Sequence, residues 1–168
     1  MDGLFLRMAT DNHALALANM SLQLVGARTA SSLSAHGKSS SPARGATFLI
    51  ITLRVTNAGK TPQLRERQAA GQFAFEPIGG ATLFAESLRA ENGPDRGSLV
   101  AQDTTPIQPA KARTGNVVFE LPAKDLSIAR RNGAVLVFTD FGQQLGDTTA
   151  NGPRNPTGEL IVRHARLR

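Results

Sequence analysis

The sequence predicts an all-β protein, a β-sandwich of about seven short antiparallel strands with one or two short helical turns. Two segments, 48–55 and 134–142, are strongly apolar and rich in β-branched residues, as expected of strands that are covered on both faces. Clusters of Gly, Pro, Asn and Asp follow these and several other apolar segments, which is typical of turns between strands. Few segments show helical spacing, so a sandwich is favoured over an α/β fold.

Residues 14–28, ALALANMSLQLVGAR, open with helix-forming Ala and Leu. The alternation at Met20, Leu22 and Leu24 predicts a strand for the second half of this stretch. Residues 1–14 are expected to form a loose N-terminal extension. Residues 29–45, TASSLSAHGKSSSPARG, consist mostly of Ser, Ala and Gly. Because such a composition buries too little to offset the entropy of ordering the chain, a long mobile loop is expected there.

The strand at 48–55 is the clearest in the chain. Its polar residues, Thr52 and Arg54, stand two positions apart and are expected on one side of the strand. A turn, NAGKTP, follows at once. The strand is expected to end here because Asn57 and Gly59 tolerate positive φ and Pro62 cannot donate a hydrogen bond to a neighbouring strand.

The later elements are assigned from apolar runs between Gly, Asn and Pro residues. Strands are predicted at 72–78 (an edge-type strand ended by Gly79 and Gly80), around 99–100, at 115–122 (closed by Pro122), at 134–142 and at 159–167. A short helix is predicted at 62–71, one helical turn before Asn132-Gly133, and either a helix or a strand with a loop at 82–93. The whole chain, 1–168, is expected to form a single domain.

Two of these segments resemble a known family. Residues 48–62, FLIITLRVTNAGKTP, are similar to a long second strand that ends in Asn and a Gly-containing turn before a polar residue and Pro. Residues 106–122, PIQPAKARTGNVVFELP, are similar to a later segment with Pro, then Gly, then an apolar run. Over about residues 20–168 the chain resembles the telokin-like, immunoglobulin-like domain of unknown function in bacterial secreted proteins and lipoproteins, and the related fold of the mycobacterial immunoprotective extracellular antigen.

The resemblance implies an immunoglobulin-like sandwich that acts as an interaction module in the cell envelope or outside the cell. It supplies no catalytic residues to carry over. The basic charge and the absence of Tyr depart from the family's usual pattern. The first residues, MDGLFLRMAT, are a poor secretory signal, because Asp2 precedes an apolar run of only three residues. Two alternatives stay open: a cytoplasmic protein, and an exported protein whose leader or anchor lies upstream. No segment has the roughly 20 apolar residues that a membrane span needs.

Charge gives a further indication of partners. The chain has 19 Lys and Arg against 13 Asp and Glu, a net charge of +6 and a pI near 11.0. Residues 1–70 hold eight basic and three acidic side chains, whereas residues 71–168 hold eleven and ten. This balance favours weak attraction to nucleic acid, anionic lipid or acidic polymers.

Three short motifs match functional sites only in part. Residues 37–39, Gly-Lys-Ser, end like a phosphate loop, but Ser32 replaces its first Gly. Residues 140–142, Asp-Phe-Gly, occur without any other kinase motif. Residues 147–152 resemble the start of a calcium loop, yet Gly158 stands where the bidentate Glu belongs. A polar loop, a strand end and an Asx turn are the simpler interpretations.

No cofactor, metal site or catalytic residue is predicted, and the protein is not expected to be an enzyme. Cys is absent, which excludes disulfides, thiolate metal sites and a thiol nucleophile. The three histidines, His13, His36 and His164, are far apart in the sequence, whereas zinc needs at least three convergent ligands. A hydrolase with an undetected site is the third alternative considered.

A basic cluster in the last predicted strand is the one candidate contact for a polyanion. It consists of Arg163, His164, Arg166 and Arg168. Arg130 and Arg131 form a smaller cluster. Nucleic-acid recognition would need stacking aromatic side chains nearby, and neither Tyr nor Trp occurs. A solvated strand end is therefore favoured over a phosphate track.

The sequence predicts a non-enzymatic binding module that meets its partner through a loop rim or an exposed strand edge. The expected partner is another protein or an anionic polymer of the envelope, and the expected location is extracellular or in the cell envelope. The alternative is a cytoplasmic basic module that binds nucleic acid or another polyanion.

Overall fold

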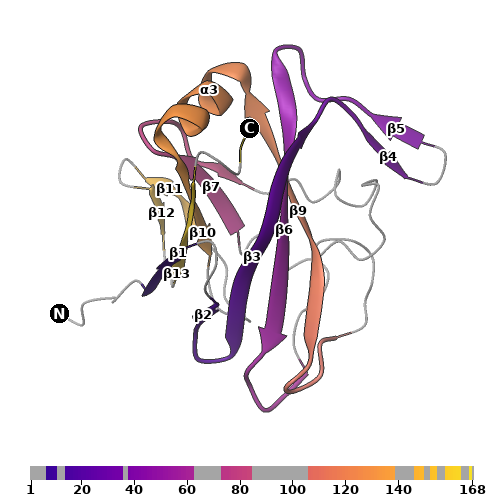
Figure 1. Ribbon diagram of the computed structural model, residues 1–168, viewed down its shortest axis with the longest axis vertical. Helices are drawn as coiled ribbons and strands as arrows, with labels where there is room; N and C mark the ends of the chain where they lie inside the picture. Colours follow the sequence, from indigo (N-terminus) through magenta and orange to yellow (C-terminus); the bar gives the residue numbers. More distant parts are fainter. Residues whose placement is uncertain are drawn as a thin grey trace.

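Two β-sheets form separate layers, on the left and right of Figure 1. The computed structural model describes residues 7–10, 14–35, 38–62, 73–84, 106–138, 146–149, 152–154, 158–163 and 167. The prediction of a mainly antiparallel β-sandwich is confirmed. That the whole chain forms one domain stays a prediction.

The four-stranded sheet has the order β2-β3-β6-β9, and all its neighbouring strands are antiparallel. It contains β2 (Leu15–Ala16), β3 (Met20–Ala30), β6 (Ala46–Asn57) and β9 (Ala112–Pro122). Three of these strands have 11 or 12 residues, so the expected short strands are wrong for this sheet. Strand β6 lies in the middle and is buried on both faces at 48–51, as its branched apolar run predicts.

The five-stranded sheet has the order β1-β13-β10-β7-β8. It contains β1 (Arg7–Thr10), β13 (Gly158–Val162), β10 (Ala134–Phe138), β7 (Phe73–Pro77) and β8 (Leu83–Phe84). Its strands have two to five residues, and β1 pairs with β13 in parallel while the other pairs are antiparallel. Two predictions are corrected here: part of the N-terminal extension is a strand, and β7 is not an edge strand because β8 pairs with it.

The core lies between the two layers. Phe119 of β9 faces Phe75 of β7, with ring centroids 5.7 Å apart, so these two side chains join the sheets. Phe73 and Phe138 pack similarly within the five-stranded sheet, at 6.3 Å. All four rings are buried, and burying large aromatic side chains is a major part of the stability of such a core.

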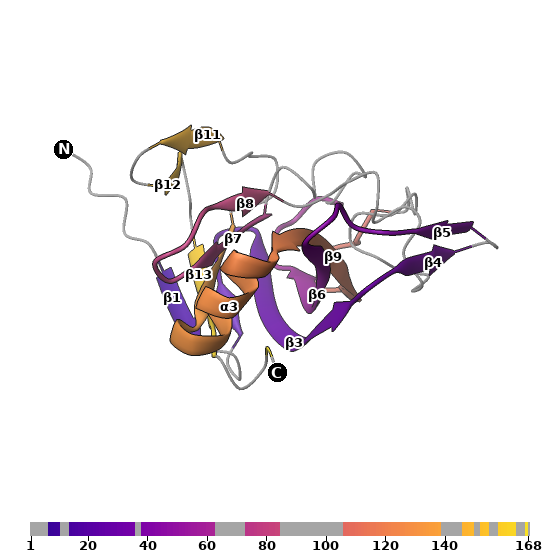
Figure 2. The same ribbon diagram turned by 90° about the horizontal axis from the view of Figure 1, so that it is seen from above.

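Helix α3 (Ala123–Asn132) follows β9 directly and covers one end of the sandwich in both ribbon views (Figures 1 and 2). Gly133, with φ of 82°, ends it, as expected of a glycine after a helix. The sequence predicted only one turn here. The apolar periodicity is weak because the helix buries little besides Asp125 and Ala129, and Asp125 accepts a hydrogen bond from the backbone N–H of Ala81 at 3.2 Å.

Residues 29–45 do not form the long loop that their composition predicts. Strand β3 continues to Ala30, and β4 (Leu33–Ala35) pairs with β5 (Lys38–Ser40) as an antiparallel hairpin. Leu33 is fully buried. This one apolar residue anchors a hairpin whose other side chains are mostly polar or small. The hairpin projects away from the two sheets in both views (Figures 1 and 2).

A second hairpin, β11 (Gly146–Thr149) and β12 (Gly152–Arg154), stands where a turn-rich connection was expected. Several predicted features lie outside the described residues. They are the helix at 62–71, the strand at 99–100, most of 82–93, the end of 134–142 and residues 164–166. In the part of the chain that is described, no helix has the length and apolar character needed to cross a membrane.

Candidate anion-binding face

Charge is unevenly divided between the two sheets. No Asp or Glu occurs between Asp11 and Glu66, and this segment supplies three of the four strands of the β2-β3-β6-β9 sheet. The fourth strand, β9, contributes Glu120, which accepts a hydrogen bond from the backbone N–H of Ala43 at 2.7 Å. Of the basic residues in the first half, Arg28 and Arg54 lie on strands of this sheet, whereas Arg7 lies on β1 of the other sheet.

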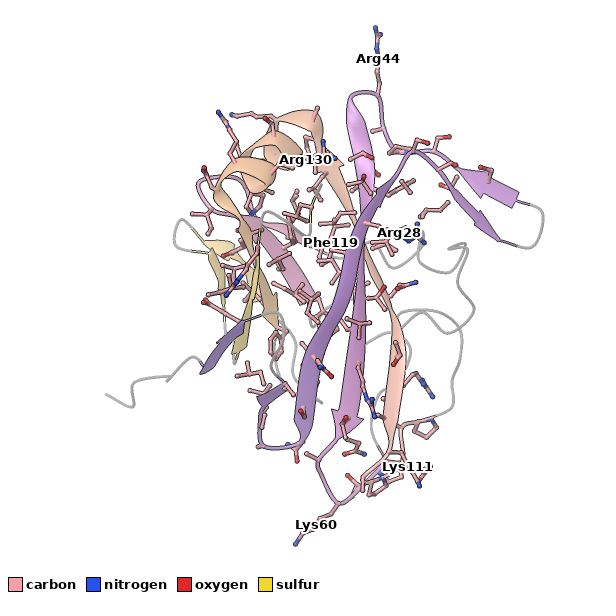
Figure 3. All side chains as sticks on the ribbon, viewed as in Figure 1. Arg28, Arg44, Lys60, Lys111, Phe119 and Arg130 are labelled. Atoms are coloured by element: carbon pink, nitrogen blue, oxygen red, sulfur yellow. The ribbon has the colours of Figure 1, made fainter. Side chains whose placement is uncertain are left out.

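Exposed cations run along this side of the molecule. Figure 3 shows Arg44 at its upper end, Arg28 in the middle, and Lys60 and Lys111 at its lower end. Arg54 is also exposed. We call this set the basic side; it consists of Arg28, Arg44, Arg54, Lys60 and Lys111.

Arg28 and Arg54 lie on the outer face of the four-stranded sheet. Leu49 pairs with Phe119, which meets the other sheet and so marks the inner face. Alternate residues of a strand share a face, so Arg54 points outward, as does Arg28, which pairs with Ile50. Arg54 is four residues after Ile50 in β6, which places the two arginines about 13 Å apart along the strands.

A polar pair stands between the two arginines. The Thr52 hydroxyl donates a hydrogen bond to Oδ1 of Asn116 at 2.7 Å, across β6 and β9. Thr52 shares the face of Arg54, which confirms the predicted polar side of this strand. Not all of this face is open, because Ile50 and Val118, which share it, are buried. Among the described residues, Arg28 and Arg54 are the exposed cations on it.

The lower end of the sheet is held together by one buried side chain, Asn57, the last residue of β6. Its Nδ2 donates to the carbonyls of Thr61 at 2.7 Å and Ile107 at 2.8 Å. Its Oδ1 accepts from the backbone N–H of Gly59 at 2.9 Å. These bonds connect the turn after β6 to the segment before β9. We call these two segments, 57–62 and 107–111, the rim.

The backbone of the rim is bonded in the same way. Asn57 donates its N–H to the Lys111 carbonyl and accepts from the N–H of Ala110, both at 2.9 Å. Ala58 donates its N–H to the carbonyl of Asn19, which brings in the turn before β3. Neither Asn57 nor Gly59 has positive φ. Positive φ at these two residues, one of the two reasons predicted from the sequence, is therefore wrong. The Asn57 side chain instead bonds the turn after the strand to the segment before β9.

Ala110 has the one positive φ among the non-glycine residues that the structure describes, at 59°. It follows Pro109 in a turn closed by a bond from the Lys111 N–H to the Gln108 carbonyl, 3.0 Å long. Proline followed by a positive φ is the pattern of a type II turn, whose third position favours Gly. The turn that carries Lys111 is therefore strained by about 1 kcal/mol.

The predicted terminal cluster is only partly described. Arg163 is exposed, whereas His164, Arg166 and Arg168 lie outside the described residues. Leu167 is buried in the core, and its carbonyl accepts a hydrogen bond from Nε of Arg130 at 2.8 Å. The backbone of Leu167 therefore lies beside the Arg130 side chain of α3. The contact of the terminal cluster with a polyanion stays a prediction.

The five-stranded sheet differs in charge. Glu76 of β7 and Glu159 of β13 flank Val135 and Val137 of β10 on its outer face, as the strand register shows. Burial raises the pKa of the Glu159 carboxyl, and the nearby Glu76 carboxylate raises it further. This face is therefore less suited than the basic side to an anionic ligand.

The metal and nucleotide motifs find no support. No group of three or more His, Cys, Asp or Glu side chains that could hold a metal ion occurs within the described ranges. Lys38 and Ser39 belong to strand β5, whereas a phosphate loop leads into a helix. Asp147 belongs to β11 of a hairpin. The Asp-Phe-Gly segment and all three histidines lie outside the described residues.

Comparisons with known proteins relate the chain to bacterial proteins through its fold. MPT63, a secreted protein from Mycobacterium tuberculosis, has 12% sequence identity and a TM-score of 0.58, over 94% of this chain and 98% of that chain. The chain shares the sandwich fold of MPT63. This agrees with the resemblance to an immunoglobulin-like bacterial domain that the sequence shows.

Other solved structures with this fold come from different bacteria. An uncharacterised β-sandwich protein from Clostridium difficile matches with 8% identity and a TM-score of 0.55, over 93% of each chain. A candidate lipoprotein from Staphylococcus aureus matches with 7% identity and a TM-score of 0.55, over 95% of this chain and 93% of that chain. None of the three names states a catalytic activity. No family model and no curated protein sequence matches the chain.

Sequence reasoning missed the basic side as a site. The acid-free stretch from Asp11 to Glu66 and the excess of basic residues were visible in the sequence. However, Arg28, Arg54 and the two rim lysines are scattered singly, and only the strand register brings them to one side of one sheet. The sequence predicts the terminal cluster as the polyanion contact instead, because its basic residues lie close together in the chain.

Proposed function

We propose that this protein is a non-catalytic module of the bacterial cell envelope that binds an extended anionic polymer along its basic side. The observation that carries the proposal is the separation of charge between the two sheets. Exposed cations follow the β3-β6-β9 strands from Arg28 to Lys60, and the strands themselves contribute one carboxylate, Glu120.

The spacing of these cations favours a long ligand over a small one. Arg28 and Arg54 stand about 13 Å apart, and three further residues of β6 lead from Arg54 to the rim, a distance of about 10 Å. A small anion binds where donors converge, whereas these groups are spread over about 23 Å. At physiological salt, charges more than about 8 Å apart are largely screened from each other, so a ligand must reach each cation in turn.

The aromatic residues argue against nucleic acid as the polymer. Single-stranded nucleic acids bind where bases stack on exposed aromatic rings. The five phenylalanine side chains that the structure describes are all buried, with at most 1% exposed: Phe48, Phe73, Phe75, Phe119 and Phe138. A polymer recognised by its charge alone, such as a polyol phosphate, fits this surface better.

The envelope location is supported by the neighbours in fold. One of them is a secreted protein and another is a candidate lipoprotein. A β-sandwich without an apparent catalytic group is suited to binding through its faces and loops. Cell fractionation of a bacterium that expresses the whole gene is the direct test, and a purely cytoplasmic protein would contradict this part of the proposal.

Binding is tested by calorimetric titration of the full chain with poly(glycerol phosphate) at increasing NaCl concentration. If about four cations contact the polymer, the slope of log K against log salt should be about −3. No binding at low salt would contradict the proposal. If single-stranded DNA of equal length bound more tightly, nucleic acid would be the ligand and not the envelope polymer.

Matched variants locate the surface. Arg28→Ser/Arg54→Ser should weaken binding and make the salt slope shallower by about 1.5. The control, Lys124→Ser/Arg131→Ser, removes the same charge from exposed positions on α3. If the control lost affinity and the Arg28 and Arg54 variant did not, the exposed face of α3 would be the binding surface instead.

A further inference from the structure

We propose that the exposed face of α3, together with Ile78, docks on an anionic lipid surface. The inference goes beyond the proposed function and does not depend on it, because no residue of α3 belongs to the basic side. Two independent observations carry it. One is a row of cations on the helix, and the other is an exposed apolar side chain that is fixed beside the end of the helix.

The cations of α3 lie on its solvent side. The buried residues of the helix are Asp125 and Ala129. Lys124, Ser127 and Arg131 stand at positions i, i+3 and i+7, which places them in one row along the helix. All three side chains are exposed. The row therefore points away from the core and carries a positive charge near each end of the helix.

Arg44 brings a further exposed cation to this end of the molecule. The Ala123 N–H donates to the Gly45 carbonyl at 2.9 Å, so the turn that carries Arg44 adjoins the first residue of α3. Figure 3 shows Arg44 pointing outward at the same end as the helix. Arg44 also belongs to the basic side, whereas the cations of α3 do not. Basic residues gathered at one surface are attracted to anionic lipid headgroups.

The carboxylates near this surface are covered or already hydrogen-bonded. Asp125 is buried and accepts a backbone N–H at 3.2 Å. Glu120 and Glu76 are half-buried and accept hydrogen bonds at 2.7 and 2.8 Å. The turns 41–46 and 78–81, which adjoin the two ends of α3, contain no Asp or Glu. The exposed charge of α3 and these turns is therefore entirely positive, which suits an anionic ligand.

Ile78 supplies an apolar contact at the same place, with 49% of its side chain exposed. Its backbone N–H donates to the Gly133 carbonyl at 3.1 Å, and its carbonyl accepts a hydrogen bond from Nδ2 of Asn132 at 2.9 Å. These two bonds fix Ile78 beside the last turn of α3. Ile128, which is only partly buried, stands one helical turn before Asn132. A single exposed isoleucine is ordinary, but cations beside an exposed apolar side chain are typical of surfaces that lie in the lipid interface.

A lipid surface fits this patch better than a soluble polymer does. A polymer recognised by its charge gains nothing from Ile78, whereas a membrane offers both anionic headgroups and an apolar layer beneath them. Helix α3 and the rim lie at opposite ends of the molecule (Figure 1). Docking through α3 would therefore leave the rim and the lower part of the basic side open to the polymer.

Co-sedimentation of the full chain with lipid vesicles tests the inference. The chain should bind vesicles of one part phosphatidylglycerol to two parts phosphatidylcholine, and should not bind vesicles of phosphatidylcholine alone. Lys124→Ser/Arg131→Ser should weaken this binding about 30-fold, because each basic residue near an anionic surface contributes about a factor of five. Arg28→Ser/Arg54→Ser, which removes the same charge from the sheet, should weaken it far less.

Fluorescence tests the apolar contact, because the chain contains no Trp. With Ile78→Trp, the emission should shift to shorter wavelength when anionic vesicles are added, since the ring enters the boundary between headgroups and acyl chains. The matched control is Val25→Trp in strand β3, at a side chain that is 48% exposed. Its emission should not shift.

Three results would overturn the inference. If the chain did not bind the anionic vesicles, an acidic protein would be the ligand that the patch fits. Equal losses in the two double variants, or equal emission shifts at positions 78 and 25, would show that α3 is not the docking face. Polymer binding is measured separately, so either proposal can fail alone. All the substituted side chains are exposed, so the variants should fold, and matching urea midpoints would show that they do.

Discussion

The two sheets of this sandwich are built differently. The β2-β3-β6-β9 sheet has three strands of 11 or 12 residues, joined at the rim by a buried asparagine and followed by exposed cations. The β1-β13-β10-β7-β8 sheet has strands of at most five residues and carries a carboxylate with a raised pKa on its outer face. One layer thus combines a long regular frame with an excess of basic charge, and we infer that it is the layer that meets a partner.

The largest effect is expected where the two sheets depend on each other. Phe119→Ala removes the ring that contacts Phe75 across the layers and should lower the free energy of unfolding by about 3–5 kcal/mol. Val25→Ala, at a side chain that is 48% exposed, should change it by less than about 0.5 kcal/mol. Urea unfolding measures both. Equal losses would mean that the layers do not share the core described here.

A smaller loss is expected at the rim, which occurs only on the four-stranded sheet. Asn57→Ala leaves the Thr61 and Ile107 carbonyls without their donor and should cost about 2–3 kcal/mol. Asn132→Ala removes one exposed hydrogen bond to the Ile78 carbonyl and should cost under about 1 kcal/mol. If the two losses measured by urea unfolding were similar, Asn57 would not hold the rim together.

The strained turn offers a gain in stability. Ala110→Gly should raise the free energy of unfolding by about 0.5–1 kcal/mol, because relief of the positive φ outweighs the added freedom of the unfolded chain. The control is Ala112→Gly, in strand β9, where no positive φ is relieved and the change should destabilise. A loss of stability at position 110 would show that the turn is not strained.

The smallest effect concerns the other sheet and depends on pH. The native protein holds the proton of Glu159 more tightly than the unfolded chain does, since its pKa is raised from the ordinary value of 4.5 by burial first and by Glu76 second. The ionised carboxylate therefore destabilises the fold above that raised pKa, and the penalty disappears as pH falls below 4.5. Glu159→Gln should be more stable than the parent at pH 7 and equal to it at pH 3. A difference that stays constant between these pH values would exclude this cause.

The fold was predictable where local and tertiary signals agree. The apolar run of β6, the alternation at Phe73 and Phe75, and the glycines that end β7 and α3 all have their expected roles. The hairpin of β4 and β5 was missed because one buried residue, Leu33, anchors it, and no average over composition reveals a single anchor. Most of helix α3 was missed because it buries almost nothing apolar.

The candidate site was less predictable than the fold. The sequence marks Asn57 as a strand end, but its bond to the Ile107 carbonyl depends on a segment 50 residues away. The charge of the first half was noted, yet the positions of Arg28 and Arg54 on one face depend on the register between strands. Register and long-range side-chain bonds are tertiary properties that local patterns do not contain.

Hydrogen–deuterium exchange, with and without long-chain polyphosphate, tests the central claim most directly. The account predicts that the polymer slows exchange in the rim and along β3 and β9, and leaves β7, β10 and β13 unchanged. Slower exchange confined to the five-stranded sheet or to α3 would contradict it.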